Sequence, residues 1–177
     1  MIRITGGSAR GRVLREPVAD GVRPTAERVR EALFSVLGQS LSGFRFLDAF
    51  AGSGAVALEA WSRGAQVVAC ERDRRALVAL RASLAGVDAD VRVVPGDVRH
   101  QLAALGRFDI AWVDPPWSED VAALAAAVAP VVDRTLIVEW EVGRALPERL
   151  GVLALRRERR YGRTAVWEFG SDGGRPG

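Results

Sequence analysis

Residues 46–54 read FLDAFAGSG, an apolar run that ends in a turn with glycines at Gly52 and Gly54. Glycine adopts φ > 0 at little cost and lets a ligand approach bare backbone, and a helix that starts after the turn offers free N–H groups. The third glycine slot of the dinucleotide fingerprint holds Ala57, and the run carries a carboxylate, Asp48, which repels phosphate but attracts a cation. The stretch therefore predicts a strand, turn and helix that bind a positively charged nucleoside without a pyrophosphate.

Apolar segments of strand length alternate with segments of helical period from Phe44 onward, which is the pattern of successive βα units and a parallel sheet. The predicted strands are 44–50, 66–71, 91–94, 108–113 and 135–140. The predicted helices are Ala55–Arg63, Asp73–Leu84, Val98–Leu105 and Glu119–Val128, with N-caps at Asp73, Asp97 and Ser118. After Gly151, an antiparallel β-hairpin is predicted from Val152–Arg160 and Thr164–Phe169. The fold class is therefore α/β, with a mostly parallel, seven-stranded sheet that ends in an antiparallel hairpin.

The first part of the chain does not follow this alternation and predicts a small extension. Ile2–Ile4 and Gly11–Leu14 favour a glycine-punctuated β-hairpin. The end of the chain is rich in glycine and predicts disorder. We therefore divide the chain into an extension at 1–43, a main domain at 44–170 and a disordered tail at 171–177.

The extension also contains a predicted helix, which follows Arg23-Pro24-Thr25. Its apolar side chains form one stripe at offsets 0, 4, 7 and 8, namely Val29, Leu33, Val36 and Leu37. Arg28, Arg30 and Glu31 are off this stripe, so we expect them to face water or a ligand.

The composition is that of an ordinary single-domain globular protein, with 177 residues of which 49% are hydrophobic. No apolar stretch approaches the roughly 20 residues that span a bilayer, and the N-terminus has no signal-peptide core. The single cysteine, Cys70, cannot form an internal disulfide, and one cysteine with one histidine argues against a zinc site. We expect a soluble, cytoplasmic monomer without metal or membrane contact.

Positive charge is concentrated at two places in the chain. All 25 basic residues are arginine, and the net charge is +3. Residues 1–30 carry seven arginines against three acidic residues, residues 150–163 carry five against one, and the remainder is acidic. Arginine offers forked donors to phosphate, so the clustering favours a polyanionic partner. A GC-rich genome or a heat-tolerant host explains the missing lysine equally well, but neither explains the clustering.

Acidic residues stand at the ends of three consecutive predicted strands, at Asp48, Glu71 and Asp97. The carboxyl ends of parallel strands share the edge at which open α/β sheets bind ligands. Glu71 lies nineteen residues after Gly52, where an acid can accept both ribose hydroxyls, and Asp97 is placed to reach an adenine edge. S-adenosylmethionine carries a sulfonium and an ammonium but no phosphate, so it fits these acids better than NAD does. The alternatives are a solvated strand end for Glu71 and a simple helix cap for Asp97.

The motif DPPW, at Asp114–Trp117, follows the apolar run 108–113 and reaches the same edge. The proline after Asp114 keeps that residue out of helical geometry, and the second proline removes another N–H donor. The segment is therefore a stiff, extended ledge that holds its oxygen acceptors in place. The alternative is a proline-rich loop with an aromatic residue packed beneath it. Trp112, by contrast, is expected in the core.

The ledge suits the exocyclic amine of a nucleobase, which is weakly nucleophilic because its lone pair is delocalised into the ring. If the Asp114 carboxylate and the Pro115 carbonyl accept hydrogen bonds from the two N–H groups of this amine, they favour the change of its nitrogen from planar to tetrahedral that accompanies attack on a methyl group. Stacking of the base on Trp117 would add roughly 1–3 kcal/mol. No strong base is needed, because the nitrogen attacks a methyl group in line and afterwards releases a proton to Asp114 or water. The motif therefore predicts methyl transfer to an aminated base.

With these motifs, the chain resembles the bacterial 16S rRNA guanine-N2 methyltransferases that modify guanine 966. The resemblance spans nearly the whole chain and rests on four stretches: ITGGSARGR at 4–12, RPT at 23–25 with RVREALF at 28–34, LDAFAGSG at 47–54, and DPP at 114–116. The two N-terminal stretches are specific to this family, whereas the glycine turn and DPP recur in many amine methyltransferases. In the family the ledge usually ends in Tyr or Phe; here it ends in Trp117, as in some adenine-N6 methyltransferases.

The resemblance implies a Rossmann-like, class I domain that binds S-adenosylmethionine. The implied cofactor-binding residues are Asp48, Phe50, Gly52, Gly54, Glu71, Arg72, Asp97 and Val98. The implied catalytic ledge consists of Asp114, Pro115, Pro116 and Trp117. The implied RNA contacts are Arg10, Arg12, Arg23, Arg28 and Arg30. The implied partner is 16S rRNA in a partly assembled small ribosomal subunit, with the target base turned out of its stack.

Two other functions fit the same residues. Nothing in Asp114–Trp117 separates guanine N2 from adenine N6 or cytosine N4, in RNA or DNA. A third hypothesis is an RNA-binding assembly factor that has kept the fold and lost catalysis. The intact acids Asp48, Glu71 and Asp114 argue against that hypothesis.

Overall fold

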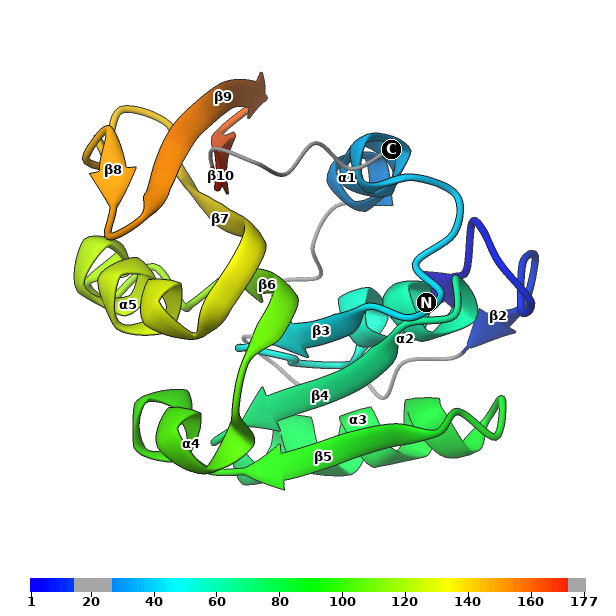
Figure 1. Ribbon diagram of the computed structural model, residues 1–177. Coiled ribbons are helices and arrows are strands. Elements are labelled where there is room, and N and C mark those ends of the chain that lie inside the picture. Colours follow the sequence, from blue (N-terminus) through cyan, green and yellow to red (C-terminus); the bar gives the residue numbers. More distant parts are fainter. Residues whose placement is uncertain (15–26, 172–177) are drawn as a thin grey trace.

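The computed structural model describes residues 1–14 and 27–171 (Figure 1). The RPT motif at 23–25 and residues 172–177 of the predicted tail lie outside these ranges. Within them, no helix combines the length and the apolar character that crossing a bilayer requires.

Strands and helices alternate along the chain as the sequence predicts. The N-terminal elements are β1 (Ile2–Arg3), β2 (Val13–Leu14) and α1 (Glu27–Leu37). The βα units comprise β3 (Arg45–Asp48), α2 (Ala55–Ser62), β4 (Gln66–Glu71), α3 (Arg74–Ala85), β5 (Val91–Pro95), α4 (Val98–Leu105), β6 (Phe108–Val113), α5 (Val121–Val128), the 3-10 helix η1 (Ala129–Val131) and β7 (Val132–Glu141). The last strands are β8 (Arg149–Leu150), β9 (Leu153–Tyr161) and β10 (Thr164–Gly170).

In the described part of the chain the main sheet has eight strands, in the order β5-β4-β3-β6-β7-β10-β9-β8. The strands from β5 to β7 are parallel, whereas β10, β9 and β8 each run antiparallel to their neighbours. This confirms the predicted mixed sheet with a terminal hairpin. The strand that the sequence did not predict is β8, which pairs with β9 across a tight turn at Gly151 (φ 61°). Two residues are too few to show a hydrophobic period.

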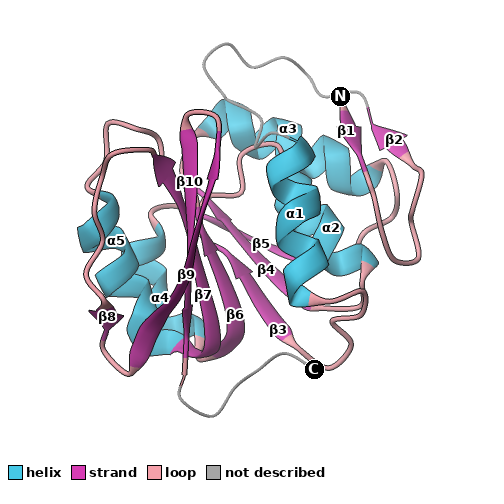
Figure 2. Cartoon of the chain, turned by 90° about the horizontal axis from the view of Figure 1, so that it is seen from above, coloured by secondary structure: helices cyan, strands magenta, loops and turns pink. Residues whose placement is uncertain are grey.

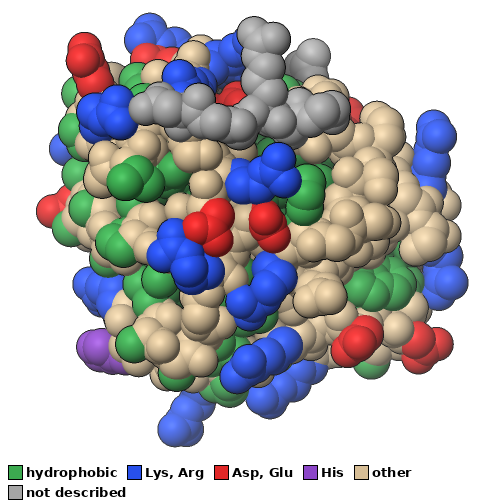
Figure 3. Space-filling model, viewed as in Figure 1, with side chains coloured by type: hydrophobic (Ala, Val, Ile, Leu, Met, Phe, Trp, Pro, Cys, Tyr) green, Lys and Arg blue, Asp and Glu red, His purple; other side chains and the backbone are tan. Residues whose placement is uncertain are grey.

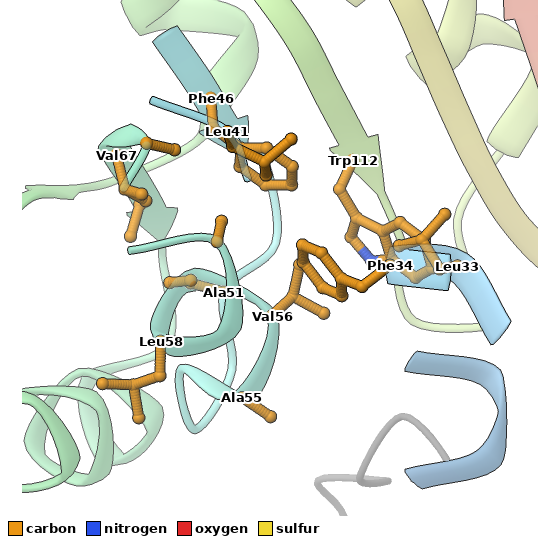
Figure 4. Close-up of a cluster of buried hydrophobic side chains, with 14 of the residues drawn as sticks. Leu33, Phe34, Leu41, Phe46, Ala51, Ala55, Val56, Leu58, Val67 and Trp112 are labelled. Carbon is orange, nitrogen blue, oxygen red and sulfur yellow. The ribbon is translucent and has the colours of Figure 1, made fainter. Parts of the chain in front are cut away.

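The sheet is packed between two layers of helices (Figure 2). The apolar side chains of α1, α2 and α3 join one core cluster, and those of α4 and α5 join the other. Strand β6 serves both clusters by alternation, with Trp112 in the first and Ala111 and Val113 in the second. Phe34 of α1 lies beside Val56 of α2 and Trp112 (Figure 4). Trp112 is 1% exposed, as predicted for a core residue.

Two of the three predicted helix N-caps are confirmed. Asp73 accepts hydrogen bonds from the backbone N–H groups of Arg75 and Ala76, both at 2.9 Å, and Asp97 caps α4. The prediction for Ser118 is wrong. Helix α5 begins at Val121, and Asp120 is its N-cap, which accepts a hydrogen bond from the N–H of Ala123 at 3.1 Å. Both are good capping residues, and the start of the helix decides between them.

The predicted N-terminal hairpin is present and is docked onto α2. Strands β1 and β2 pair antiparallel, and the hairpin continues through hydrogen bonds between Ile4 and the loop. The N–H of Ser8 donates to the carbonyl of Ser62 at 2.7 Å, at the end of α2. Gly7 has φ +74°, and a Cβ there would lie 1.8 Å from that same carbonyl oxygen. The glycine of the GGSARGR motif is therefore required by docking of the hairpin.

A buried carboxylate, that of Glu59 in α2, holds the hairpin and α1 in place. Its Oε1 accepts hydrogen bonds from the N–H groups of Thr5 and Gly6, both at 3.0 Å, and it forms an ion pair with Arg63. The guanidinium of Arg30 lies 3.6 Å from Glu59 and donates to the carbonyl of Arg3 at 2.8 Å. Arg30 is 3% exposed, so the prediction that it faces water or RNA is wrong. The buried carboxylate of Glu59 compensates the charge of Arg30, and hydrophobic periodicity in the sequence cannot reveal such a partner.

Candidate active site

The carboxylates of Asp48, Glu71 and Asp114 come together at the carboxyl edge of the sheet. Asp48 is the last residue of β3, Glu71 is the last residue of β4, and Asp114 directly follows β6. Strand β3 lies between the other two, with Asp48 paired in register to Ala69 and Trp112. The predicted convergence of these three acids is therefore what the sheet order produces.

Asp48 is the most unusual of the three carboxylates. It is 1% exposed, and within the described residues neither of its oxygens makes a hydrogen bond. Burial, followed by the charges of Asp114 and Glu71, raises its pKa to about 8. The N–H groups of Phe50 and Ala57 approach the carboxylate and oppose this rise, without reaching hydrogen-bonding geometry. A buried carboxylate with so little compensation is a strong acceptor for a cation.

Glu71 is bound to the glycine turn. One of its oxygens accepts a hydrogen bond from the N–H of Gly52 at 2.9 Å, and the other accepts one from the N–H of Asp73 at 2.7 Å. Each oxygen keeps a second lone pair, which a ribose hydroxyl can use. Gly54 is left-handed (φ 89°), and a Cβ there would lie 2.6 Å from a methyl group of Leu80, so packing requires this glycine. The turn is thus shaped by the protein before any ligand binds.

Asp97 lies on the same rim but has a partner of its own. Its carboxylate caps α4 through the N–H of Arg99 at 3.0 Å and also binds the Arg99 guanidinium. The hydrogen bond from Arg99 lowers the pKa of Asp97 to about 2. The adjacent Gly96 donates to the backbone carbonyl of Glu71 at 2.8 Å, which places this loop beside β4. The helix-cap alternative is therefore present in the structure, and contact with adenine stays a prediction, as it does for Val98.

Arg72 connects the second strand tip to the DPPW segment. It forms an ion pair with Glu119, and the N–H of Glu119 donates to the carbonyl of Pro116 at 2.9 Å. Phe50 is partly buried against the core cluster of α4 and α5. A role for Arg72 and Phe50 in cofactor binding stays a prediction; the sequence did not indicate the contact with Glu119.

The DPPW segment exposes its aromatic residue. Pro115 is buried, Asp114 is half-buried and Trp117 is 39% exposed at the surface. The guanidinium of Arg163 lies 5.4 Å from the centre of the Trp117 ring and forms an ion pair with Glu141 at 3.1 Å. Arg163 and Glu141 are site residues that sequence reasoning missed. The predicted C-terminal hairpin was the signal that could have found them. Its second strand, β10, pairs antiparallel with β7, which places the turn of the hairpin at the carboxyl edge of the sheet.

The predicted RNA-contacting arginines have different surroundings. Arg10 and Arg12 are exposed on the N-terminal hairpin loop, and Arg12 donates to the carbonyl of Gly86 at the end of α3 at 2.9 Å. Arg23 and the side chain of Arg28 lie outside the described residues. In Figure 3, arginine side chains surround a few acidic ones near the centre of this face of the molecule.

Comparison with known proteins supports what the motifs indicate. A family model described as "Conserved hypothetical protein 95" matches residues 2–170. The chain belongs to this family. Its relatives include the "Ribosomal RNA small subunit methyltransferase D" of Escherichia coli, which is 40% identical over 172 residues, covering 93% of this chain and 87% of the relative. The Haemophilus influenzae protein of the same name is 32% identical over 134 residues, covering 72% of this chain and 69% of the relative.

The fold of the family is also shared. The solved structure of the Escherichia coli protein yhhF matches with a TM-score of 0.83 and 36% identity, covering 98% of this chain and 99% of that one. The family resemblance that the four motifs indicate is therefore confirmed, and so is the class I methyltransferase architecture. The site described above lies at the carboxyl edge, where open α/β sheets bind their ligands.

Proposed function

We propose that this protein transfers a methyl group from S-adenosylmethionine to the exocyclic N2 of guanine 966 in 16S rRNA of the small ribosomal subunit. The observation that carries the proposal is the convergence of Asp48, Glu71 and Asp114 beside the exposed Trp117. The names of the relatives, which specify a methyltransferase of small-subunit rRNA, support the same substrate class.

The acids fit the charge of this methyl donor. S-adenosylmethionine supplies an electrophilic methyl group on a sulfonium and departs as a neutral thioether. Glu71, and Asp48 once it has released its proton, offer negative charge to its cationic end and hydrogen-bond acceptors to its ribose. Phe50, Arg72, Asp97 and Val98 follow the tips of β3, β4 and β5 and complete the proposed binding set, together with Gly52 and Gly54.

The ledge would then hold the base. The Asp114 carboxylate and the Pro115 carbonyl accept the two N–H bonds of the amine, which aims its nitrogen lone pair at the methyl group. Rigid acceptors favour the charge that develops on this nitrogen, and Asp114 or water receives the proton after transfer. Trp117 stacks on the base, and Pro116 keeps the segment extended.

We also propose the division of labour within the chain. Residues 1–43 form an RNA-contacting extension in which Arg10 and Arg12 bind phosphates, with Arg23 and Arg28 as further contacts, and residues 44–170 form the catalytic domain. Arg30 is removed from this set because its guanidinium is committed to Glu59. The proposed location is the cytoplasm, where a monomer meets assembling small subunits.

One observation favours a second candidate, an adenine-N6 methyltransferase, because the ledge ends in Trp117. The experiment that decides is nucleoside analysis of 16S rRNA after small subunits from a strain lacking this enzyme are incubated with the protein and S-adenosylmethionine. We expect N2-methylguanine at position 966. N6-methyladenine would replace the proposal by the second candidate. No methylated nucleoside and no binding of S-adenosylmethionine would favour the non-catalytic assembly factor.

A further inference from the structure

The two faces of β9 differ in how their arginines are used. The register pairs Arg159 with Val166 and Tyr161 with Thr164 of β10, and Arg157 with Glu168, so these three β9 side chains lie on the face that turns toward α1. Within the described residues neither Arg157 nor Arg159 forms an ion pair. On the opposite face, Arg160 is paired with Glu158 at 2.8 Å.

The face toward α1 borders an open recess, here called the hairpin groove. The recess is shallow, and its floor is apolar, formed by Val29, Leu33 and Val36 of α1 with Ile137 and Val166 of the sheet. Arg157, Arg159 and Tyr161 form its wall, and Glu168 is the one acidic side chain among the described lining residues. Apolar or aromatic surface interleaved with unpaired arginines is the combination that binds single-stranded nucleic acid.

The turn of the hairpin links a residue that lines the hairpin groove to one that lies at the candidate active site. Tyr161 ends β9, and Arg163 follows it after one glycine. Arg163 lies over Trp117, and its carbonyl accepts a hydrogen bond from the N–H of Val142 at 2.9 Å, which fixes the turn beside the end of β7. Arg163 and Tyr161 therefore lie along the chain between the contact with Trp117 and Arg159.

We propose that the hairpin groove binds the single-stranded rRNA that flanks the target guanine, with phosphates on Arg157 and Arg159 and a neighbouring base against the partly exposed side chains of Tyr161 and Val36 at its rim. This rests on the proposed function, which it extends from one nucleotide to its neighbours. RNA is favoured over an acidic protein segment because the turn next to the groove contacts Trp117, on which the proposed function stacks the target base. The arginine cluster at 150–163 thereby acquires a role separate from that of the N-terminal arginines.

The test compares two double variants with equal loss of charge. Arg157→Gln/Arg159→Gln removes both arginines of the groove wall, and Arg149→Gln/Arg160→Gln removes two exposed arginines outside it. Methyl transfer to small subunits from a strain lacking the enzyme is measured over a series of salt concentrations. We expect the groove variant to raise KM about tenfold with kcat unchanged, and to reduce the slope of log affinity against log salt by about 1.5, because two phosphates are no longer neutralised. The control variant should change KM less than about threefold.

Each other outcome overturns the proposal. Equal effects of the two double variants would mean that only net charge matters. A groove variant that binds protein-free 16S rRNA as well as the parent, but binds small subunits less well, would place a ribosomal protein in the groove. If wild-type protein yields N2-methylguanine and the groove variant keeps its KM and salt slope, the proposed function stands and this inference alone fails.

The apolar floor provides an independent test on α1. Val36→Glu places a negative charge in the hairpin groove, whereas Ser35→Glu places the same charge on the exposed side of the same helix. We expect Val36→Glu to raise KM for small subunits at least about fivefold because it repels phosphate, and Ser35→Glu to change it less than about twofold. Equal KM values for these two variants at equal melting temperature would contradict RNA in the groove.

Discussion

The two ends of the main sheet carry opposite charge. In the parallel part, the tips of β3, β4 and β6 place Asp48, Glu71 and Asp114 together. In the antiparallel part, β9 and its turn carry five arginines and one acidic residue between 156 and 163. A net charge of +3 conceals this separation. This separation fits the two ligands that we propose, a cation at the acidic strand tips and a polyanion along the basic hairpin.

At the boundary between these parts, the acidic and the basic regions come into contact. Strands β7 and β10 form this boundary, and at its carboxyl edge Arg163 of the basic hairpin pairs with Glu141 of β7 and lies over Trp117. The acidic and the basic parts of the sheet therefore come together at Trp117, the exposed aromatic residue of the ledge.

Removal of the acid closest to the base should have the largest effect. We expect Asp114→Ala to lower kcat by about 10³-fold, because an oriented acceptor at the reacting nitrogen is lost. Affinity for S-adenosylmethionine should change little. Single-turnover methyl transfer and calorimetric titration measure the two quantities. An Asp114→Ala protein with normal turnover would remove the amine-acceptor role.

Glu59 is a buried carboxylate whose charge is compensated by hydrogen bonds and an ion pair, whereas the carboxylate of Asp48 has neither among the described residues. Thr5, Gly6 and Arg63 bind Glu59, so its charge stabilises the fold. We expect Glu59→Ala to lower the free energy of unfolding by about 3 kcal/mol or more, since Arg63 is left buried without its acid. Denaturant unfolding measures this, with the exposed Glu148→Ala as control. Equal stability of the two variants would deny Glu59 its structural role.

Trp117 should tolerate only an aromatic replacement. Loss of base stacking costs roughly 1–3 kcal/mol, so Trp117→Ala should lower kcat/KM between about fivefold and a hundredfold, while Trp117→Phe should retain most activity. Steady-state methyl transfer to small subunits compares the two. If both variants are equally active, Trp117 does not hold the base.

The N-terminal arginines should have the smallest effect on activity. Arg10→Ala/Arg12→Ala should weaken binding to small subunits a few-fold and reduce the salt slope by about 0.7–0.9 for each phosphate that is no longer neutralised. The carbonyl of Gly86 loses its partner as well, so melting temperature is measured in parallel. An unchanged salt slope would show that this loop faces away from RNA.

The sheet and the three-acid cluster were predictable because both depend on short-range pattern. Apolar runs mark the strands, parallel order brings their tips to one edge, and Asp48, Glu71 and Asp114 stand at those tips. Arg30 was mispredicted for a physical reason: a charged residue off the apolar stripe normally faces water, and its burial depends on Glu59, which is 29 positions away along the chain.

The remaining site contacts depend on tertiary placement or local competition. Arg163 reaches Trp117 only because β10 pairs with β7 in the register that joins Thr164 to Glu141. No local pattern determines that register. Asp97 was predicted both as a helix cap and as an adenine contact, and the sequence contains no sign that Arg99 would bind the same carboxylate.

The raised pKa of Asp48, about 8 against an ordinary value of 3.8, also predicts how stability varies with pH. Between these values the folded, cofactor-free protein keeps Asp48 protonated, whereas the unfolded chain releases that proton. Its contribution to stability is therefore full below about pH 4 and is lost as the pH rises to about 8. The free energy of unfolding of the wild-type protein should therefore fall between about pH 4 and about pH 8, and Asp48→Asn should lack this contribution to the fall. Parallel pH profiles for the two proteins would contradict the raised pKa.

If the acidic strand tips receive a cationic methyl donor, the Kd of S-adenosylmethionine must depend on pH. Binding requires ionised Asp48, so Kd should fall by up to about tenfold per pH unit between about pH 6 and about pH 7.5, where an α-ammonium group is still largely charged. Asp48→Asn should bind more weakly at the upper pH and lack this slope. A wild-type Kd that is the same at both ends of the range, or an equal slope in Asp48→Asn, would contradict the account.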